Sequence, residues 1–316
     1  MTVPHPQTIL EDATENDIVQ SIQELKEKYD KGQNISKYLR ESNTYNTQKI
    51  VEIAYDLQAG SYYENYLHDG SVREYYINAA KEIFAIIHSL CPNAQSILEA
   101  GIGEGNFIKD LLDNFDDEVE GAGFDIGWSR VAYARMYLSS TRHKNIELFT
   151  GDLLNIPCAE NSFDIVYTSH AIEPNHKNEE KIIHELYRIT KKYMILREPC
   201  YELASDDARK RMDANGYVKG IESILKKNGY DIVDFKLSAY IRNPLNPSAI
   251  WVVKKGGDSI HDFKIACPQF KCKLEKIDGA FYSDKGMKVY PIIGGIPCLR
   301  IDNGILASKY GFFAKK

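Results

Sequence analysis

The chain has 316 residues, a formal net charge of −6, and 43% hydrophobic and 27% charged residues. These values are typical of a folded protein with one large and one smaller domain, and the acidic balance excludes a general affinity for nucleic acid. No basic segment followed by an apolar run marks a signal peptide, and no run reaches the roughly 18 apolar residues of a membrane span, so no membrane association is expected. The six cysteines are scattered, which favours reduced thiols and a cytoplasmic location.

The first part of the chain, residues 1–45, is predicted to be a helical extension. Apolar residues recur at helical spacing over residues 15–29, which predicts an amphipathic helix. Residues 31–45 are polar and are predicted to form a loop.

Residues 46–257 are predicted to form the main domain, in which strands and helices alternate. A long helix is expected over 72–90, before the alternation begins. The alternation predicts βαβ units and a parallel sheet covered by helices on both faces. The expected strands are 96–100, 118–126, 146–152, one within 162–172, and 193–199, and the expected helices are 105–115, 129–138, 179–190 and 214–229.

The end of the chain departs from this alternation. Two further strands are expected over 231–241 and 249–255, with two prolines and no helix between them, so the sheet should end in an antiparallel hairpin. After Gly256-Gly257 the sequence has short β-like runs and turn residues. Residues 258–316 are therefore predicted to form a separate, small β-rich module.

Three glycines follow the first predicted strand, at Gly101, Gly103 and Gly105. Ligands of open α/β sheets bind beyond the carboxyl ends of the strands, so glycines at this turn would let a ligand approach the backbone. A dinucleotide would use the same kind of turn, and a tight turn without a ligand is the plain structural alternative.

Acidic residues stand at the ends of successive strands. Glu99 would repel a pyrophosphate and attract an ammonium group. Asp125 can accept hydrogen bonds from ribose hydroxyls, and Asp152 can bind the amino group of adenine, with the Leu153 backbone completing the base contact. An ammonium, a ribose and an adenine in this order indicate S-adenosylmethionine. The structural alternatives are that Asp125 caps a helix and that Asp152 stabilises a turn.

Residues 96–199 resemble the Rossmann-like (class I) S-adenosylmethionine-dependent methyltransferases, specifically those of methyltransferase type 11. The resemblance lies in “EAGIGEG”, “GFDIGWS” and “GDLLNIPCAENSFDIVYTSHAIEP”, in that order. It implies an α/β fold with a seven-stranded, mostly parallel sheet and a terminal antiparallel strand.

The resemblance also implies a set of cofactor-binding residues. Glu99 would meet the methionine amino group, and the turn glycines would let the backbone lie against the cofactor. The full expected set is Glu99, Gly101, Gly103, Asp125, Ile126, Asp152, Leu153, Ser169, Tyr63 and Arg73.

Tyrosines gather upstream of the first strand, in “YDLQAGSYYENY”. In the resembling family this region folds over the cofactor as a lid, so a tyrosine such as Tyr63, or Arg73, would bind the methionine carboxylate. A surface helix that buries its aromatic residues against the core is the alternative.

Candidates for a general base lie in the loop after the fourth strand. His170 and Glu173 are the predicted catalytic residues, and His176 lies in the same loop. A hydrogen-bonded structural role is the alternative for His170. Glu198, at the end of the fifth strand, either lines the substrate site or caps the following turn.

The tail, through “ACPQFKCKLE” and “VYPIIGGIPCL”, is similar to the small zinc-ribbon-like proteins that activate methyltransferases. Metal-binding members carry two Cys-x-x-Cys pairs. Here four residues separate Cys267 from Cys272, and Ser283 and Gly286 stand where the second pair would fall, so no metal site is predicted. We expect the module to dock on the main domain through “VYPII” and “GIPCL”, because attachment makes the docking intramolecular. A flexible tethered domain that recruits substrate is the alternative.

These observations predict an enzyme that transfers a methyl group to an oxygen or nitrogen atom of a small molecule or a sugar-containing metabolite. A methyltransferase acting on tRNA or a translation protein is one alternative, which the activator-like tail supports. The tail is basic, since residues 258–316 hold ten Lys/Arg and six Asp/Glu. A non-catalytic cofactor-binding module is the other alternative.

Overall fold

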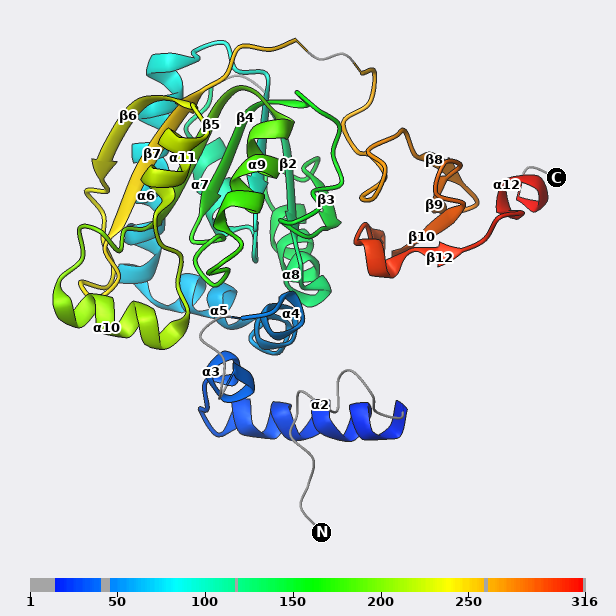
Figure 1. The fold of residues 1–316 in the computed structure, drawn as a ribbon, viewed down its shortest axis with the longest axis horizontal. Helices are drawn as coiled ribbons and strands as arrows, with labels where there is room; N and C mark the ends of the chain where they lie inside the picture. Colours follow the sequence, from blue (N-terminus) through cyan, green and yellow to red (C-terminus); the bar gives the residue numbers. More distant parts are fainter. Residues whose placement is uncertain (1–14, 41–45, 117–118, 259–260, 315–316) are drawn as a thin grey trace.

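The computed structural model describes residues 15–40, 46–116, 119–258 and 261–314. A seven-stranded sheet forms the centre, and helices cover both of its faces. A small β module lies beyond one edge of this sheet, and the N-terminal helices lie beneath the sheet (Figure 1). Among these residues no helix combines the length and apolarity needed to cross a membrane. The helices before the sheet are α2 (Glu15–Asp30), α3 (Ile35–Arg40), α4 (Gln48–Leu57), α5 (Ser61–His68) and α6 (Gly70–Leu90).

The N-terminal helices pack through a small apolar cluster of their own, which includes Leu25 of α2, Leu39 of α3 and Ile50 of α4. The polar segment predicted as a loop contains α3, so that prediction is wrong over Ile35–Arg40, and its residues 41–45 lie outside the described residues. The reason is local: the Asn34 side chain accepts the Lys37 N–H at 2.9 Å and caps the helix, whose two apolar residues are buried.

The sheet has the strand order β3-β2-β1-β4-β5-β7-β6. The first five strands pair in parallel, and β7, the last strand of this sheet in the chain, runs antiparallel between β5 and β6. The predicted Rossmann-like α/β fold with a final hairpin is therefore confirmed. The strands are β1 (Ser96–Ala100), β2 (Glu120–Asp125), β3 (Glu147–Thr150), β4 (Phe163–Ser169), β5 (Thr190–Pro199), β6 (Asp231–Leu237) and β7 (Ser248–Lys254).

Consecutive strand residues point to opposite faces of the sheet, and both faces are apolar. On one face Ile97 and Ile165 join the cluster formed with α6, α7 and α8. On the other, Leu98 and Val166 join the cluster formed with α9 and α11. The helices that follow the strands are α7 (Asn106–Leu112), α8 (Trp128–Ser139), α9 (Glu179–Ile189), α10 (Asp206–Asn215) and α11 (Ile221–Lys227).

The prediction of a single helix over 214–229 is wrong. Helix α10 ends at Asn215, and α11 begins only at Ile221. The segment between them holds Gly216 at φ 66° and Gly220 at φ 69°, in the left-handed region that ends a helix. This break turns α10 away from the sheet and places it beneath the carboxyl ends of the strands (Figure 1).

The C-terminal module is a small antiparallel sheet, as predicted. Its strands pair in the order β11-β10-β9-β8, and β12 pairs with β10. Its elements are β8 (Glu275–Ile277), β9 (Ala280–Ser283), β10 (Lys288–Ile293), β11 (Ile296–Pro297), the short 3-10 helix η1 (Ile301–Asn303), β12 (Ile305–Leu306) and α12 (Tyr310–Phe313).

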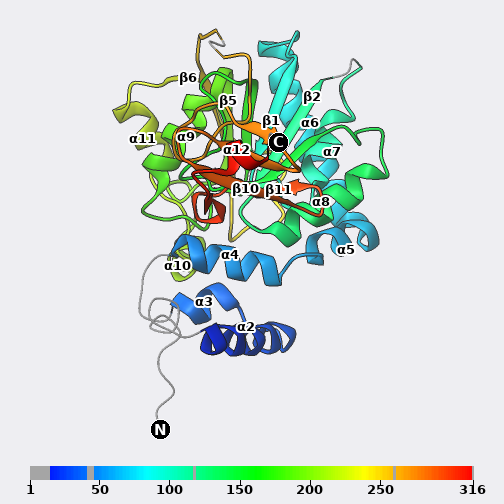
Figure 2. The same ribbon diagram turned by 90° about the vertical axis from the view of Figure 1, so that its right-hand side faces the viewer.

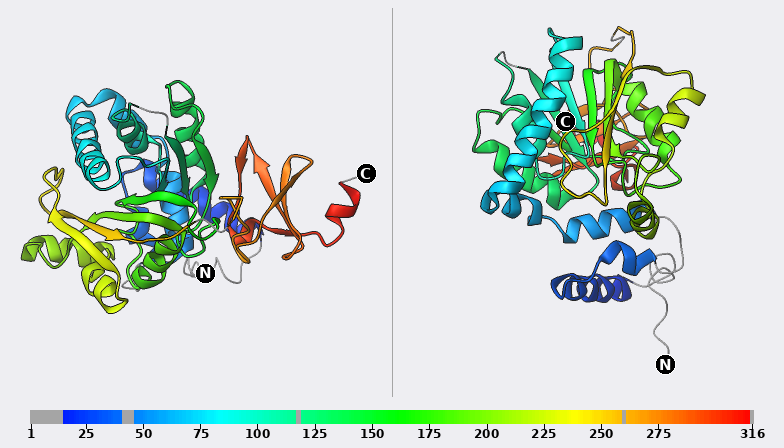
Figure 3. Two further views of the ribbon diagram at one scale, coloured as in Figure 1. Left: turned by 90° about the horizontal axis from the view of Figure 1, so that it is seen from above. Right: turned by 90° about the vertical axis from the view of Figure 1, so that its left-hand side faces the viewer.

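The module docks against the β3 edge of the large sheet, as Figures 2 and 3 show from the side and from above. Cys298 pairs in parallel with Thr150, and the Leu299 N–H donates to the Thr150 carbonyl at 3.1 Å. Trp128 of α8 donates from Nε1 to the Ile293 carbonyl at 3.3 Å. The predicted contacts through “GIPCL” and the end of “VYPII” are therefore present.

Apolar packing joins the module to the main domain. One buried cluster contains side chains from both parts, and its members near the junction are Phe149, Ile156, Cys158, Cys267, Tyr290 and Leu299. Backbone bonds reinforce it, because the Ala159 N–H donates to the Lys264 carbonyl at 2.8 Å and the Ala266 N–H to the Pro157 carbonyl at 2.9 Å. The module edge and the sheet edge thus satisfy each other's backbone groups.

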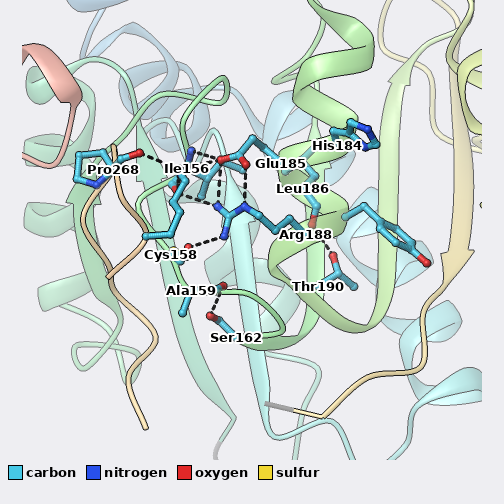
Figure 4. Close-up of polar contacts among 12 residues, drawn as sticks. Ile156, Cys158, Ala159, Ser162, His184, Glu185, Leu186, Arg188, Thr190 and Pro268 are labelled. Atoms are coloured by element: carbon cyan, nitrogen blue, oxygen red, sulfur yellow. Dashed lines mark hydrogen bonds and ion pairs between the residues drawn. The ribbon is translucent and has the colours of Figure 1, made fainter. Parts of the chain in front are cut away.

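Charge complementarity adds to this contact. Lys271 of the module bonds Glu185 at 3.0 Å and the Ile156 carbonyl at 3.0 Å. Arg188 donates to the Ile156 and Cys158 carbonyls at 3.0 and 2.7 Å and so fixes the segment on which the module rests (Figure 4). The basic tail therefore meets the acidic main domain.

We expect Leu299→Ala to lower the free energy of unfolding by about 2–5 kcal/mol, because it leaves a cavity in the cluster that both parts share. Denaturant unfolding measures the change. Leu306→Ala is the matched control, because Leu306 belongs to the same module and is 77% exposed. A chain truncated after Lys255 that stays soluble with an unchanged melting temperature would contradict the docking as a stabilising contact.

Candidate functional site

A cavity of about 380 Å³ lies at the carboxyl ends of β1, β2 and β4. Helices α4 and α5 border it from the N-terminal side and α10 with the loop before β7 from the other. Nine residues predicted for the site line it, namely Glu99, Gly101, Gly103, Asp125, Ile126, Leu153, Ser169, His170 and Glu173.

The glycine turn forms the cavity floor. Gly101 and Gly103 have φ values of 78° and 54°, which side chains other than glycine rarely adopt. A Cβ on Gly101 would lie 2.3 Å from the Cβ of Ala171, so a side chain there would collide with the loop after β4. The glycines thus bring the turn close both to that loop and to the cavity.

Glu99 is 2% exposed, and its Oε2 has no hydrogen-bond partner among the described residues. Burial raises the pKa of Glu99 well above its ordinary value, although the nearby Tyr167 hydroxyl and Ile108 N–H act to lower it. A cationic group bound beside Glu99 would stabilise its ionised form.

Asp125 uses both of its oxygens to organise the backbone around it. Oδ2 accepts the Gly103 N–H at 3.1 Å, and Oδ1 accepts the Gly127 N–H at 3.0 Å. Because an ionised carboxylate has about four acceptor positions, both oxygens can still accept hydroxyl donors from the cavity. Asp125 therefore stabilises the turn and remains available to a ligand.

Arg130, on the first turns of α8, was not predicted from the sequence. Its side chain is 7% exposed and lines the cavity, with the guanidinium 5.3 Å from the Tyr55 ring and 4.6 Å from the Tyr62 ring. Its Nε and Nη1 have no hydrogen-bond partner within the described part of the chain. Burial lowers the pKa of Arg130, but nearby groups led by Asp125 outweigh burial and raise it above its ordinary value.

The tyrosine segment does border the cavity, but through Tyr55 and Tyr62. Tyr63 is absent from the lining. Its N–H donates to Glu104 at 2.5 Å, and its ring packs against Tyr137 at 5.4 Å. The segment is thus both a wall of the cavity and an aromatic contact with α8.

Two other predicted residues also lie away from the cavity wall. Asp152 accepts the Leu154 N–H at 2.9 Å, which is the turn-stabilising alternative. Arg73 is exposed and donates to the Leu67 carbonyl at 3.2 Å. Asp152, Tyr63 and Arg73 are therefore not among the residues that line the cavity, although Gly151 and Leu153, on either side of Asp152, are.

The predicted base candidates form a hydrogen-bonded chain. His170 Nδ1 lies 2.5 Å from Glu173 Oε2, and His170 Nε2 lies 2.9 Å from Ser248 Oγ. Because a carboxylate only accepts, Nδ1 carries a proton, and in the neutral imidazole Nε2 is then the acceptor. Ser248 begins β7, far away in the sequence, and it also lines the cavity. His176 bonds Glu179 at 2.6 Å and is not part of the lining.

Glu198 holds the loop that carries this chain of residues. It is completely buried and accepts three backbone N–H groups at 3.0–3.1 Å, from Ala171, Ile172 and Glu173. Burial raises the pKa of Glu198 to about 7, although nearby His170 acts to lower it. Glu198 therefore has a structural role. It binds the loop that follows β4, and not the turn that follows β5.

The far wall of the cavity comes from α10 and the loop between β6 and β7. Arg211, Tyr217, Arg242 and Asn246 contribute to it. Asn246 donates to Glu173 Oε1 at 3.2 Å. The sequence offers no periodic or motif signal for these residues. Arg211 lies on α10, Tyr217 directly follows the glycine at its end, and Arg242 and Asn246 lie in a proline-containing loop.

The C-terminal module, for which no metal site is predicted, brings Cys272, Ser283 and Gly286 together. Cys272 Sγ lies 3.6 Å from Ser283 Oγ, and Gly286 donates its N–H to the same oxygen at 3.1 Å. The positions at which the resembling proteins carry cysteine pairs thus meet here. In the described part of the chain, no three His, Cys, Asp or Glu side chains group so as to hold a metal ion.

Comparison with known proteins agrees with this geometry. Residues 97–193, which run from β1 into β5, match the family model described as a methyltransferase domain. Magnesium protoporphyrin IX methyltransferase (ChlM) from Synechocystis PCC 6803, solved with bound SAH, is similar with a TM-score of 0.53 and 16% identity, over 66% of this chain and 100% of that chain.

A second similar structure comes from the complex between the Haloferax volcanii Trm112 methyltransferase activator and the putative methyltransferase. The TM-score is 0.52 and the identity 15%, over 67% of this chain and 100% of that chain. At such identities the structural likeness shows the fold alone. Residues 97–193 therefore match a methyltransferase domain, and they lie within a Rossmann-like fold.

Proposed function

We propose that this domain transfers a methyl group from S-adenosylmethionine to an oxygen or nitrogen atom of a small molecule, such as a sugar-containing metabolite. The observation that carries the proposal is that one cavity of about 380 Å³ joins acidic residues suited to the cofactor with a His–Glu pair suited to proton removal. A cavity of this size takes a small molecule or a protruding group.

The residues present fit the cofactor. Glu99, whose Oε2 is without a partner, would hold the amino group, and Asp125 would accept the ribose hydroxyls. Arg130, with two buried donors unused, would hold the carboxylate, in place of the Tyr63 or Arg73 expected from the sequence. Leu153 and Ile126 line the same cavity and would contact the adenine. When bound, S-adenosylmethionine supplies a methyl group on a positively charged sulfur.

His170 would receive the proton of the acceptor at Nε2. Glu173 fixes the tautomer through Nδ1–H and would stabilise the imidazolium that forms. Ser248 hydrogen-bonds to Nε2 in this structure, so an acceptor hydroxyl would either replace it or pass its proton through it. The enclosing tyrosines and α10 would exclude water and orient the acceptor.

The alternative acceptor, tRNA or a translation protein, is supported by the activator-like tail and its basic charge. Three of the ten Lys/Arg of the tail pair within the chain, since Lys264, Lys271 and Arg300 contact Glu120, Glu185 and Glu52 of the main domain. Since paired lysines and arginines are less available to phosphates, this pattern favours the small-molecule acceptor.

The role of Glu99 can be tested through pH. Its raised pKa means that the folded state binds this proton more tightly than the unfolded chain, so stability is lost as pH rises through the raised pKa. We expect Glu99→Gln to raise the melting temperature of the free protein at about pH 8, with the difference vanishing toward about pH 4. The same variant should weaken S-adenosylhomocysteine binding about tenfold or more in calorimetry. Glu64→Gln, on the exposed face of α5, is the control.

Arg130 can be tested with two ligands that differ in one part. We expect Arg130→Met to weaken S-adenosylhomocysteine about tenfold or more and to leave 5′-methylthioadenosine, which lacks the amino-acid portion, unchanged. Calorimetry with both ligands gives the comparison. An equal loss for both would show that Arg130 contacts the ribose or the base and would contradict the carboxylate assignment.

The proposed chemistry is tested by supplying labelled S-adenosylmethionine and a low-molecular-mass cell extract. We expect label in a small molecule, and His170→Asn to reduce the transfer rate about 100-fold with unchanged S-adenosylhomocysteine affinity. His184→Asn, on the outer face of α9 and bonded to Tyr230, is the control. Undiminished transfer by His170→Asn would remove the proposed base.

A further inference from the structure

The far wall of the cavity has a positive character that the proposed cofactor contacts do not use. Arg211 of α10 and Arg242 of the β6–β7 loop both line the cavity. The chain as a whole is acidic, with a formal net charge of −6, so two further arginines in one cavity do not follow from composition.

Arg211 has an unused donor at the cavity. Its Nη1 is buried and has no hydrogen-bond partner among the described residues, and its guanidinium lies 5.5 Å from the Tyr217 ring centre. A buried guanidinium nitrogen without an acceptor is unfavourable, and a carboxylate or phosphate oxygen satisfies it best. The stacked tyrosine limits the orientations of the guanidinium and so reduces the entropy lost on binding.

The carboxylates of the cavity have other partners or are assigned to the cofactor. Glu173 is hydrogen-bonded to His170 and Asn246, and Glu104 accepts the N–H groups of Gly60 and Tyr63. Over the described ranges, neither Arg211 nor Arg242 forms an ion pair, and Asp213, two residues beyond Arg211, pairs with Lys219. The two guanidinium groups are therefore left without an ion-paired carboxylate.

We propose that the methyl acceptor is an anionic small molecule whose carboxylate or phosphate is bound by Arg211 and Arg242. This inference rests on the proposed function, because it names the acceptor of the same cavity. Binding the anionic group at this wall would place the rest of the acceptor toward His170, which lines the same cavity. Arg211 and Arg242 are thus specificity residues, and Arg130 serves the cofactor.

The test starts from a low-molecular-mass extract separated by anion exchange into retained and unretained fractions. Each fraction is incubated with the full-length protein and methyl-labelled S-adenosylmethionine. Label in the retained fraction supports an anionic acceptor. Loss of that acceptor activity after phosphatase treatment identifies a phosphate, and its survival identifies a carboxylate.

Variants then assign the contact. We expect Arg211→Met and Arg242→Met each to lower kcat/KM for the retained acceptor about tenfold or more, mainly through KM, with unchanged S-adenosylhomocysteine affinity and melting temperature. Lys210→Met is the matched control, because Lys210 is the neighbouring residue of α10, with its side chain 78% exposed. Full activity in both arginine variants would overturn the proposal.

The two levels of the argument fail differently. Label confined to the unretained fraction overturns the anionic acceptor and leaves the small-molecule methyltransferase standing. Label in neither fraction, with S-adenosylhomocysteine still bound in calorimetry, overturns the small-molecule function and the anionic acceptor with it.

Discussion

The loop that follows β4 is held in place by the carboxylate of Glu198, which is completely buried and accepts three consecutive backbone N–H groups. His170, just before those donors, is held at φ 61°, a conformation that a histidine rarely adopts without support. The same anchor places Glu173 against His170 and places Ala171 where only a glycine fits opposite it, at Gly101. The floor of the cavity, the His170–Glu173 pair and the glycine turn therefore depend on one carboxylate.

That arrangement explains why some of the site could be predicted from the sequence. Glu99 and Asp125 lie at the ends of β1 and β2, and the glycines follow β1. In a parallel sheet the carboxyl ends of the strands must meet along one edge. His170 follows the next strand and joins them for the same reason. Short-range patterns were sufficient wherever a strand end alone fixed the position of a side chain.

Other parts of the site depend on packing that no local pattern encodes. Arg130 is five residues beyond Asp125 on an ordinary-looking helix, and its importance lies in two buried donors without partners. Ser248 and Arg211 reach the cavity only because β7 inserts between β5 and β6 and because the glycines after α10 separate it from α11. Asp152 shows the reverse case, in which a strand-end carboxylate turns back to its own loop.

The tethered module has a consequence for how the protein behaves at low concentration. In an assembly of separate chains, such as the Haloferax complex, the fraction of enzyme that carries its partner falls on dilution. Here the module that continues the β3 edge is joined through Gly256 and Gly257, so each molecule contains one copy of each part. Its occupancy of that edge is therefore independent of protein concentration.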